Sequence, residues 1–285
     1  MKFKYTFFNY PLLHSFNAKE ILRGRTKVSL DLGLSIEEVR REGEEIIVRE
    51  FRVAVEDVER IAKDRRNFIW CVREEGLLKL LFFDGKVYKL RLVSPHTAPT
   101  LEVDGVHMHR IKGITPWEDA RIKVEVLDVK DCKVLDICTG LGYTAIWEKK
   151  LGASEVLSVE KDENVLMIAQ FNPWSRGLEE VQIEVGDAFY FLGNLREKFD
   201  RILIDPPREV FAPELYSRAF FKKVLKVLDE KGKVFIYTGE PGVKRGRVFW
   251  RDVMRRMREV GFKKLEYIEE SRGICLLYTS PSPRD

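Results

Sequence analysis

The second part of the chain alternates apolar runs with amphipathic stretches. The apolar runs predict strands at 133–138, 155–160, 181–185, 200–205 and 233–238, and a closing pair at 263–268 and 273–279. Helical spacing predicts helices near 143–151, 162–171, 213–228 and 247–260. Strands that alternate with helices form a mostly parallel sheet. We therefore predict a seven-stranded α/β domain over residues 116–279.

The first 115 residues have a different pattern. Short strand-like runs occur at 27–30, 45–48, 68–72, 77–83 and 87–92, and one amphipathic helix is predicted at 55–62. Asp84-Gly85 between the last two runs predicts a hairpin turn. These features predict a small α+β or β-rich N-terminal domain over residues 1–115. We expect this domain to help bind a substrate.

Composition narrows the classes of protein. The chain of 285 residues is 45% apolar, which is enough for a sizeable core. It has no apolar run of membrane-spanning length and no signal-like start, so we expect a cytoplasmic protein. The cysteines form no C-x-x-C pair, and we expect no metal site. The high charged content, 34%, with few amides is typical of thermophiles. A net charge of +4 permits a nucleic-acid partner without requiring one.

The last six residues, 280–285, do not look like part of the natural protein. Ser280 to Asp285 resembles a translated sequencing-adapter artefact. We expect residues 280–285 to be an artefactual tail and exclude them from functional reasoning. The true C-terminus is then not defined by this sequence.

The run from Asp136 to Gly142 combines an acidic strand ending with two glycines before a predicted helix. Glycines let a ligand approach the backbone closely, as in nucleotide-type pockets. Gly140-Leu141-Gly142 lacks the third glycine of the dinucleotide fingerprint, because Ala145 stands there. Glu160 ends the next predicted strand, where a carboxylate accepts ribose hydroxyl hydrogen bonds. The pattern favours a nucleoside cofactor over an ordinary strand–helix turn.

Further motifs are Met108-His109-Arg110, Asn172-Pro173-Trp174-Ser175, Gly186-Asp187-Ala188-Phe189, Asp205-Pro206-Pro207-Arg208 and Glu214-Leu215-Tyr216-Ser217. With D-x-x-T-G-x-G at 136–142, they resemble an archaeal group predicted to be class I S-adenosylmethionine (SAM) methyltransferases. The resemblance implies a Rossmann-like fold and SAM as cofactor. It implies cofactor contacts from Asp136, Cys138, Thr139, Gly140, Gly142, Glu160, Lys161, Asp187 and Ala188.

The D-P-P-R motif gives the catalytic candidates Asp205, Pro206, Pro207 and Arg208. In nucleic-acid amino methyltransferases, [DN]-P-P-[YFW] at this place accepts hydrogen bonds from an exocyclic amine, and its aromatic residue stacks on the base. The resemblance implies that Asp205 accepts from the substrate and that the prolines rigidify the turn. Arg208 departs from the aromatic pattern. An arginine stacks on a base or binds a phosphate, or it forms a surface ion pair with Glu209.

Residues near the expected ligand edge are candidates for substrate binding: His109, Arg110, Tyr216, Lys244, Arg245 and Arg247. The basic loop from Lys244 to Arg247 follows the fifth predicted strand and is suited to phosphate contacts. His109 lies in the segment before the domain, and it either contacts substrate or serves a structural role. We expect RNA (tRNA or rRNA) to be the partner.

Several functions stay open at this level. The first is methyl transfer to a nitrogen or oxygen atom of RNA. A polyamine-type aminopropyltransferase shares the fold but uses decarboxylated SAM, and it needs acidic residues around its amine substrate. A small-molecule or protein methyltransferase and a non-catalytic RNA-binding scaffold remain alternatives. Uridine C5-methyltransferases also carry D-P-P-R, but residues 237–242 contain no cysteine nucleophile. The sequence does not define an oligomeric state.

Overall fold

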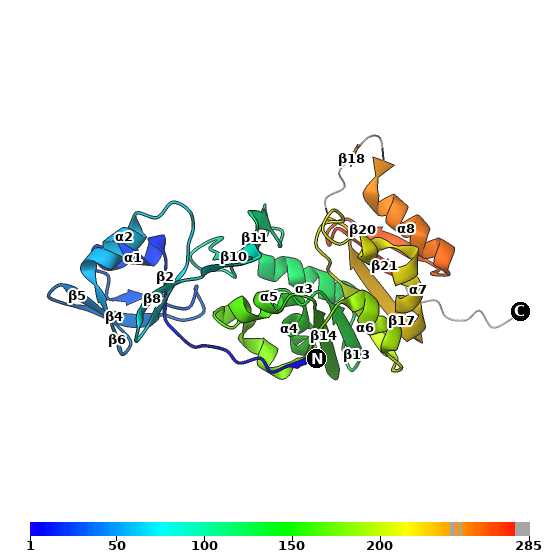
Figure 1. The fold of residues 1–285 in the computed structure, drawn as a ribbon, viewed down its shortest axis with the longest axis horizontal. Helices are drawn as coiled ribbons and strands as arrows, with labels where there is room; N and C mark the ends of the chain where they lie inside the picture. Colours follow the sequence, from blue (N-terminus) through cyan, green and yellow to red (C-terminus); the bar gives the residue numbers. More distant parts are fainter. Residues whose placement is uncertain (240–242, 245–246, 277–285) are drawn as a thin grey trace, which may run out of the picture. The chain divides into compact units, whose positions relative to one another are not determined.

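Figure 1 shows the computed structural model of the chain, which describes residues 1–239, 243–244 and 247–276. Three stretches lie outside the described residues: 240–242, 245–246 and 277–285. They include Arg245 and the suspected artefactual tail. Only the backbone is described for Lys244 and Arg247. These three basic residues therefore stay substrate-binding predictions.

The chain divides into two compact units. The large-sheet unit comprises Met1–Lys4, Glu118–Glu163 and the chain from Glu180 on. The small-sheets unit comprises Tyr5–Trp117 and Asn164–Glu179. Residues 164–179 were expected in the second domain, but their aromatic side chains pack in the small-sheets unit. Trp174 is an example, because its Nε1 donates to the Leu32 carbonyl over 3.2 Å.

One sheet organises the large-sheet unit (Figure 1), in the order β1-β15-β14-β13-β16-β17-β21-β20. Its strands are β1 (Lys2–Phe3), β13 (Lys133–Ile137), β14 (Glu155–Glu160), β15 (Gln182–Val185), β16 (Phe199–Ile204), β17 (Leu228–Tyr237), β20 (Leu265–Ile268) and β21 (Gly273–Leu276). Strands β13 to β17 run parallel, and the other three pair antiparallel. The predicted α/β fold class is confirmed. The sheet has eight strands instead of seven, because β1 is too short to leave a hydrophobic pattern.

Helices cover both faces of this sheet. They are α3 (Pro116–Leu127), α4 (Tyr143–Lys150), α6 (Ala188–Asn194), α7 (Arg218–Val227) and α8 (Phe249–Val260), with a 3₁₀ turn at Pro213–Tyr216. Side chains of α6, α7 and α8 form one apolar core with Leu135 and Ile204 of the sheet. Neighbouring strand residues point to the opposite face. There, Asp136 meets α4, and Arg201 Nε donates to Leu127 of α3 over 2.7 Å.

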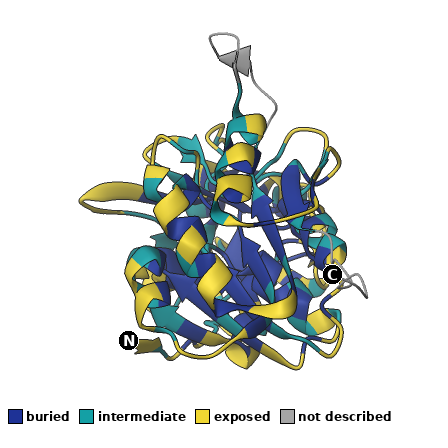
Figure 2. Ribbon diagram, turned by 90° about the vertical axis from the view of Figure 1, so that its right-hand side faces the viewer, coloured by how far each residue is buried: buried dark blue, intermediate teal, exposed yellow. Residues whose placement is uncertain are grey.

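Figure 2 shows the result in terms of burial, with dark blue strands between helices that are yellow on their outer faces. Helix α8 shows why such a face forms. Val253, Met254 and Met257 recur at helical spacing and are buried. Gly261 ends the helix with a φ of 122°, a value that residues with a Cβ rarely adopt. A two-stranded hairpin, β18 (Val243–Lys244) with β19 (Arg247–Val248), precedes α8.

The small-sheets unit contains three antiparallel sheets, which are β3-β4-β5-β6, β2-β7-β8 and β12-β11-β10-β9. Their strands are β2 (Leu12–Leu13), β3 (Lys27–Val28), β4 (Glu37–Glu42), β5 (Glu45–Val48), β6 (Phe51–Ala54), β7 (Trp70–Arg73), β8 (Gly76–Lys79), β9 (Leu81–Asp84), β10 (Lys86–Arg91), β11 (Thr100–Val103) and β12 (Val106–His107). Its helical segments are α1 (Ser15–Leu22), α2 (Val55–Ala62), most of α5 (Glu163–Ala169) and most of the 3₁₀ segment Pro173–Glu180. Helices α1 and α2 share an apolar core with the strands. The hairpin predicted at Asp84-Gly85 joins β9 to β10.

No helix among the described residues is both long enough and apolar enough to span a membrane.

Candidate functional site

The glycine-rich turn follows β13 at the carboxyl edge of the parallel strands. Cys138, Gly140 and Gly142 have positive φ values of 75°, 55° and 80°. The backbone N–H groups of Cys138 and Thr139 both donate to the Val159 carbonyl, at 2.9 and 3.2 Å. A Cβ placed on Gly140 would meet only the Cys138 carbonyl oxygen, 3.9 Å away. The turn therefore leaves its backbone open to a close-lying ligand.

Asp136 anchors this turn from below. Its two carboxylate oxygens accept hydrogen bonds from Thr144 Oγ1 at 2.7 Å and Ser158 Oγ at 2.6 Å. The residue is fully buried, and burial raises the pKa of its carboxyl to about 6, with the two hydroxyls opposing the shift. Thr139 joins the network through Ser158, 2.6 Å away. In this geometry Asp136 and Thr139 support the turn; cofactor contacts from them stay predictions.

The thiol of Cys138 is embedded in the same region. Burial raises its pKa well above the usual value, and nearby carboxylates add to the shift. A thiol held in its protonated state is a poor nucleophile. Cys138 therefore shapes the turn through its positive φ, and its predicted cofactor contact stays a prediction.

Glu160 ends β14 beside the turn. Its Oε2 accepts the Gly140 N–H and its Oε1 accepts the Asp162 N–H, both at 2.9 Å. Burial raises the pKa of the carboxyl, and these backbone hydrogen bonds oppose the shift. Each oxygen keeps a lone pair for a second donor. A carboxylate fixed in this way at a nucleotide-type turn fits the two hydroxyls of a ribose, so these residues fit a nucleoside cofactor.

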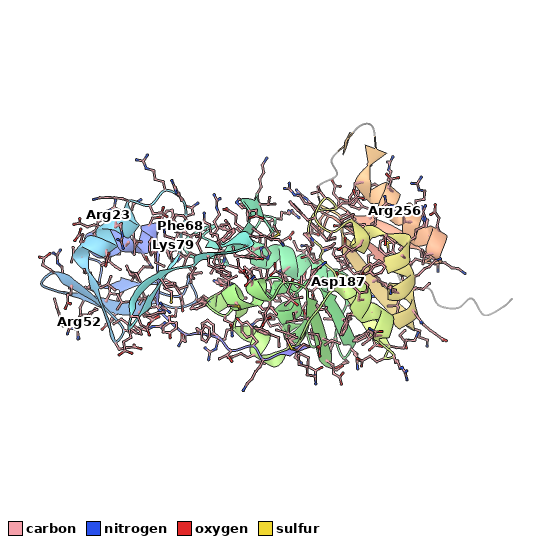
Figure 3. The ribbon with its side chains drawn as sticks, viewed as in Figure 1. Arg23, Arg52, Phe68, Lys79, Asp187 and Arg256 are labelled. Carbon is pink, nitrogen blue, oxygen red and sulfur yellow. The ribbon has the colours of Figure 1, made fainter. Side chains whose placement is uncertain are left out.

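Asp187 follows β15 and caps α6. Its Oδ1 accepts the Phe189 N–H at 2.9 Å, and its Oδ2 pairs with Lys161 Nζ at 2.7 Å. Lys161 is 66% exposed, so this ion pair is largely solvated. Ala188, the next residue, is buried. Figure 3 labels Asp187. The structure thus joins Asp187 and Lys161, two predicted cofactor residues from different strands.

Asp205, directly after β16, forms a buried ion network that the sequence did not reveal. Lys123 Nζ of α3 donates to both of its carboxylate oxygens, at 2.9 and 2.8 Å. The same ammonium lies 2.9 Å from Asp119 Oδ2. Burial raises the pKa of Asp205, and Lys123 opposes this shift. Burial by itself would lower the pKa of Lys123, but the two carboxylates outweigh it and the pKa is raised.

Two tyrosines belong to this region, one against Lys123 and one against the D-P-P turn. The Lys123 ammonium lies 4.0 Å from the ring centroid of Tyr237. Tyr216 is buried, and its hydroxyl donates to the Pro207 carbonyl over 3.1 Å. The buried hydroxyl of Tyr216 supports the D-P-P turn, and its predicted contact with a substrate stays a prediction. Pro206 is buried as well, so the turn has a fixed base.

The residues after the prolines form an exposed β-turn. The Phe211 N–H donates to the Arg208 carbonyl over 2.8 Å, which closes the turn. Arg208 is exposed, and the Phe211 side chain is 55% exposed. Glu209, the alternative partner of Arg208, lies 3.5 Å from Arg256 instead, a residue that Figure 3 labels. Arg208 and Phe211 therefore present a cation and an aromatic ring at the two ends of one turn.

His109 and Arg110 belong to the small-sheets unit. His109 Nδ1 lies 3.0 Å from Thr100 Oγ1 and accepts the Leu101 N–H at 3.4 Å. These contacts orient the imidazole on β11. The predicted contacts of both residues with a substrate stay predictions.

Sequence reasoning missed Lys123, Asp119 and Tyr237. The spacing of Asp119 and Lys123 is that of an ordinary surface ion pair on a helix. Both side chains are nevertheless at most 4% exposed. The only signal was that α3 leads directly into the glycine-rich strand. That position alone does not reveal a buried charge.

Comparison with known proteins places these features in context. The family model for the spermine/spermidine synthase domain matches residues 153–269, less than half of the chain. The uncharacterized protein MJ1233 of Methanocaldococcus jannaschii is 36% identical over 281 residues, which cover 94% of each chain. Ribosomal protein L11 methyltransferase of Dictyoglomus turgidum is 30% identical over 137 residues, covering 48% of this chain and 40% of that one.

A solved structure supports the fold. Spermidine synthase from Thermotoga maritima aligns with a TM-score of 0.50 and 18% identity, over 65% of each chain. At this identity the likeness concerns the fold alone. The chain therefore has the class I fold that SAM-dependent methyltransferases share with aminopropyltransferases.

Proposed function

This chain belongs to the protein family of MJ1233 from Methanocaldococcus jannaschii, and on that premise we propose that it is a SAM-dependent methyltransferase acting on RNA. One observation carries the proposal. The two strands that flank β13 each lead to a carboxylate: Glu160 is the last residue of β14, and Asp205 directly follows β16. Glu160 and the glycine turn suit a nucleoside, and Asp205 suits a hydrogen-bond donor that is to be alkylated. Cofactor and acceptor would then meet at one sheet edge.

The cofactor side of the site consists of residues that can bind a nucleoside through hydrogen bonds and close backbone contact. Glu160 would accept the ribose hydroxyls, and Gly140 leaves room for the ligand. Asp187 and Lys161 would line the base, as the family resemblance implies. When bound, SAM supplies an electrophilic methyl group. The protein's own task is to hold the acceptor atom in line with that group.

The acceptor side depends on Asp205. Lys123 fixes both of its oxygens, so the carboxylate has one orientation and its outer lone pairs remain for a substrate N–H or O–H. Such a fixed acceptor orients the nucleophile. It also stabilises the positive charge that develops on the attacking atom during transfer. A nitrogen or oxygen atom of the substrate is the proposed nucleophile, since residues 237–242 contain no cysteine for a covalent route.

RNA is our preferred substrate because of the turn that follows Asp205. Arg208 and Phe211 are exposed at its two ends, where a guanidinium and a ring can bind a phosphate and stack on a base. A protein substrate is the chief rival, because the partial relative from Dictyoglomus turgidum is named for a ribosomal protein. The turn offers no acidic residue for a cationic side chain other than Glu209, which lies near Arg256.

An aminopropyltransferase is the second candidate, favoured by the spermine/spermidine synthase match over residues 153–269. Such an enzyme must bind a cationic amine with free carboxylates. Here Lys123 already occupies the space between Asp119 and Asp205, as a built-in cation. This arrangement lowers the attraction for a second ammonium group. The methyltransferase is therefore the better supported of the two.

The experiment uses protein lacking residues 280–285 and two labelled cofactors, SAM and decarboxylated SAM, with an extract of unmodified RNA and protein. Label from SAM that RNase removes would support the proposal. Label that only protease removes would indicate a protein methyltransferase. Transfer from decarboxylated SAM alone would favour the aminopropyltransferase, and cofactor binding without transfer would favour the scaffold. Asp205→Asn is the matched control for background label.

A further inference from the structure

Lys79 on β8 lies between two aromatic rings of the small-sheets unit. Its ammonium is 4.5 Å from the ring centroid of Phe68 and 4.6 Å from that of Trp70. Trp70 and Lys79 are directly opposite in the β7–β8 pairing. Phe68 precedes Trp70 by two residues and so shares its face. Figure 3 labels Phe68 and Lys79 side by side.

These rings hold the ammonium without neutralising it. A cation–π contact fixes the position of a charge and leaves its net value unchanged. Within the described residues, Lys79 has no carboxylate oxygen within ion-pair distance. The long side chain is thereby pre-organised, which lowers the entropy lost when an anion binds. Lys79 is therefore a positioned charge that lacks a partner of opposite sign in the described chain.

The loop before Phe68 carries three more cations: Lys63, Arg65 and Arg66 are exposed and have no ion pair among the described residues. The acid within the loop, Asp64, accepts the N–H groups of Arg66 and Phe68, each at 2.9 Å. Lys89 Nζ donates to the Arg66 carbonyl over 2.9 Å. The side chains of Asp64 and Lys89 thus hold the backbone of the loop, and its cations are left for a ligand.

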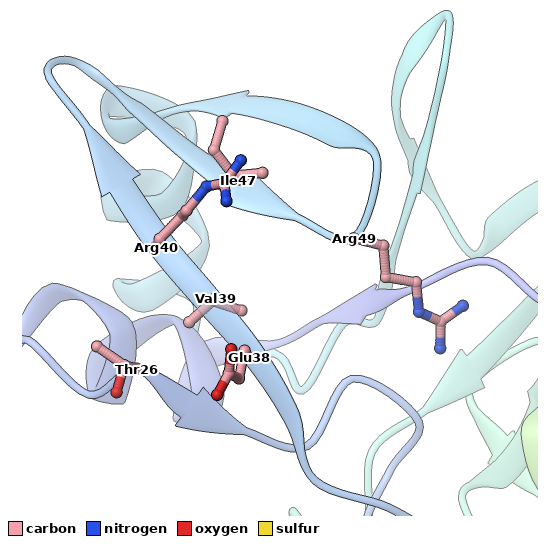
Figure 4. A pocket seen from close by; sticks show the side chains of 6 residues that line it. All are labelled: Thr26, Glu38, Val39, Arg40, Ile47 and Arg49. Carbon is pink, nitrogen blue, oxygen red and sulfur yellow. The ribbon is translucent and has the colours of Figure 1, made fainter.

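A pocket elsewhere in the same unit provides a contrast (Figure 4). It is lined by Thr26, Glu38, Val39, Arg40, Ile47 and Arg49. Its arginines are already neutralised, because Arg49 donates to both oxygens of Glu37 and Arg40 pairs with Glu42. A phosphate would have to displace these carboxylates. The pocket is therefore a weaker anion site than the four unpaired cations.

We propose that Lys63, Arg65, Arg66 and Lys79, with the rings of Phe68 and Trp70, form a platform that binds the phosphate backbone of RNA. We call it the Lys79 platform. The identity of the nucleic acid rests on the proposed function. The platform reads charge and not sequence, because the cations already cover the rings and base stacking on them is blocked.

The test measures equilibrium binding of a labelled, unstructured RNA oligonucleotide, without cofactor, over a range of salt concentrations. The platform variant combines Lys79→Met, Arg65→Gln and Arg66→Gln. The control combines Lys130→Ala, Lys150→Ala and Lys231→Ala, which removes the same charge from exposed lysines of the large-sheet unit. The platform variant should bind about tenfold more weakly at low salt, and its log–log salt slope should fall by about 2, at roughly 0.7 per phosphate contact.

The outcomes separate this proposal from the methyltransferase itself. Loss of affinity and slope in the platform variant alone, with unchanged circular dichroism, supports the platform. Equal binding by the platform and control variants overturns it, even when the wild type methylates RNA. Wild-type protein that fails to bind RNA at low salt also overturns it, whereas labelling from SAM judges the proposed function separately. The single variant Lys79→Arg keeps the charge and should bind the RNA as tightly as the wild type.

Discussion

Replacement of Lys123 by methionine removes the charge beneath the D-P-P turn and keeps the length of the side chain. The lost ammonium contacts Asp119 at 2.9 Å and Asp205 at 2.8 Å. The three side chains are 4%, 3% and 20% exposed, so water replaces little of the lost interaction. Removal of one partner of a buried ion pair costs about 3–5 kcal/mol. We expect Lys123→Met to lower the free energy of unfolding by that amount at pH 7.

The deficit should depend on pH, with a sign set by Asp205. Burial raises the pKa of this carboxyl, and Lys123 opposes the rise. Without Lys123, the folded-state pKa lies further above the unfolded value. Stability from such a group is present below the unfolded pKa and is lost as pH rises through the folded pKa. The deficit of the variant should therefore shrink as the pH is lowered from 7 towards 4.

Urea denaturation, followed by circular dichroism and by hydrogen exchange of β13 and β16 amides, measures this effect. Lys133→Met is the matched control, because Lys133 pairs with Glu155 and Glu197 but is 32% exposed. A solvated pair of this kind contributes about 0–1 kcal/mol. Equal losses in the two variants would refute our reasoning, as would a Lys123→Met deficit that is the same at both ends of the pH range.

Three further predictions concern the acids of the site. Asp205→Asn should slow transfer by at least about 10²-fold while cofactor affinity stays unchanged, since a positioned acid–base group contributes roughly that factor; loss of affinity in calorimetry would contradict the assignment. Glu160→Ala should weaken SAM binding by about 1–3 kcal/mol, because ribose hydroxyls are left unpaired; an unaltered dissociation constant would remove Glu160 from the pocket. Burial raises the pKa of Asp136 to about 6, so its stabilising contribution is lost as pH rises through that value. The stability of wild type relative to Asp136→Asn should fall by up to about 3 kcal/mol between pH 4 and 7, and a pH-independent difference in denaturation would count against it.

The sequence predicted the parallel core well, because buried strands and their glycine-rich turn leave continuous apolar runs. It was less informative for β4, which reads Glu-Glu-Val-Arg-Arg-Glu and buries only Val39. A strand of this composition has no alternating pattern to detect. The strand exists because β5, which is apolar, pairs with it.

The sequence indicated where the acidic residues of the candidate site stand along the strands, but not their interactions. The sequence shows that Asp136, Glu160 and Asp205 lie at or next to the carboxyl ends of three buried strands. Their partners are not evident, because Lys123 comes from a helix 82 residues before Asp205. A buried ion pair depends on tertiary packing, and helical spacing assigns both Lys123 and Asp119 to a solvated face. The burial of Tyr216 was not evident for the same reason, since it depends on α8 and the D-P-P turn.

The division of the chain into two units limits how the protein can be truncated. The polypeptide passes between the units at four junctions: Lys4/Tyr5, Trp117/Glu118, Glu163/Asn164 and Glu179/Glu180. Neither unit is a contiguous segment, so no single truncation yields either one complete. A fragment that starts at residue 116 would lack β1 and leave the edge of β15 unpaired, which invites aggregation. Expression of the large-sheet unit alone therefore requires two replacement linkers. One linker replaces residues 5–117, and the other replaces residues 164–179.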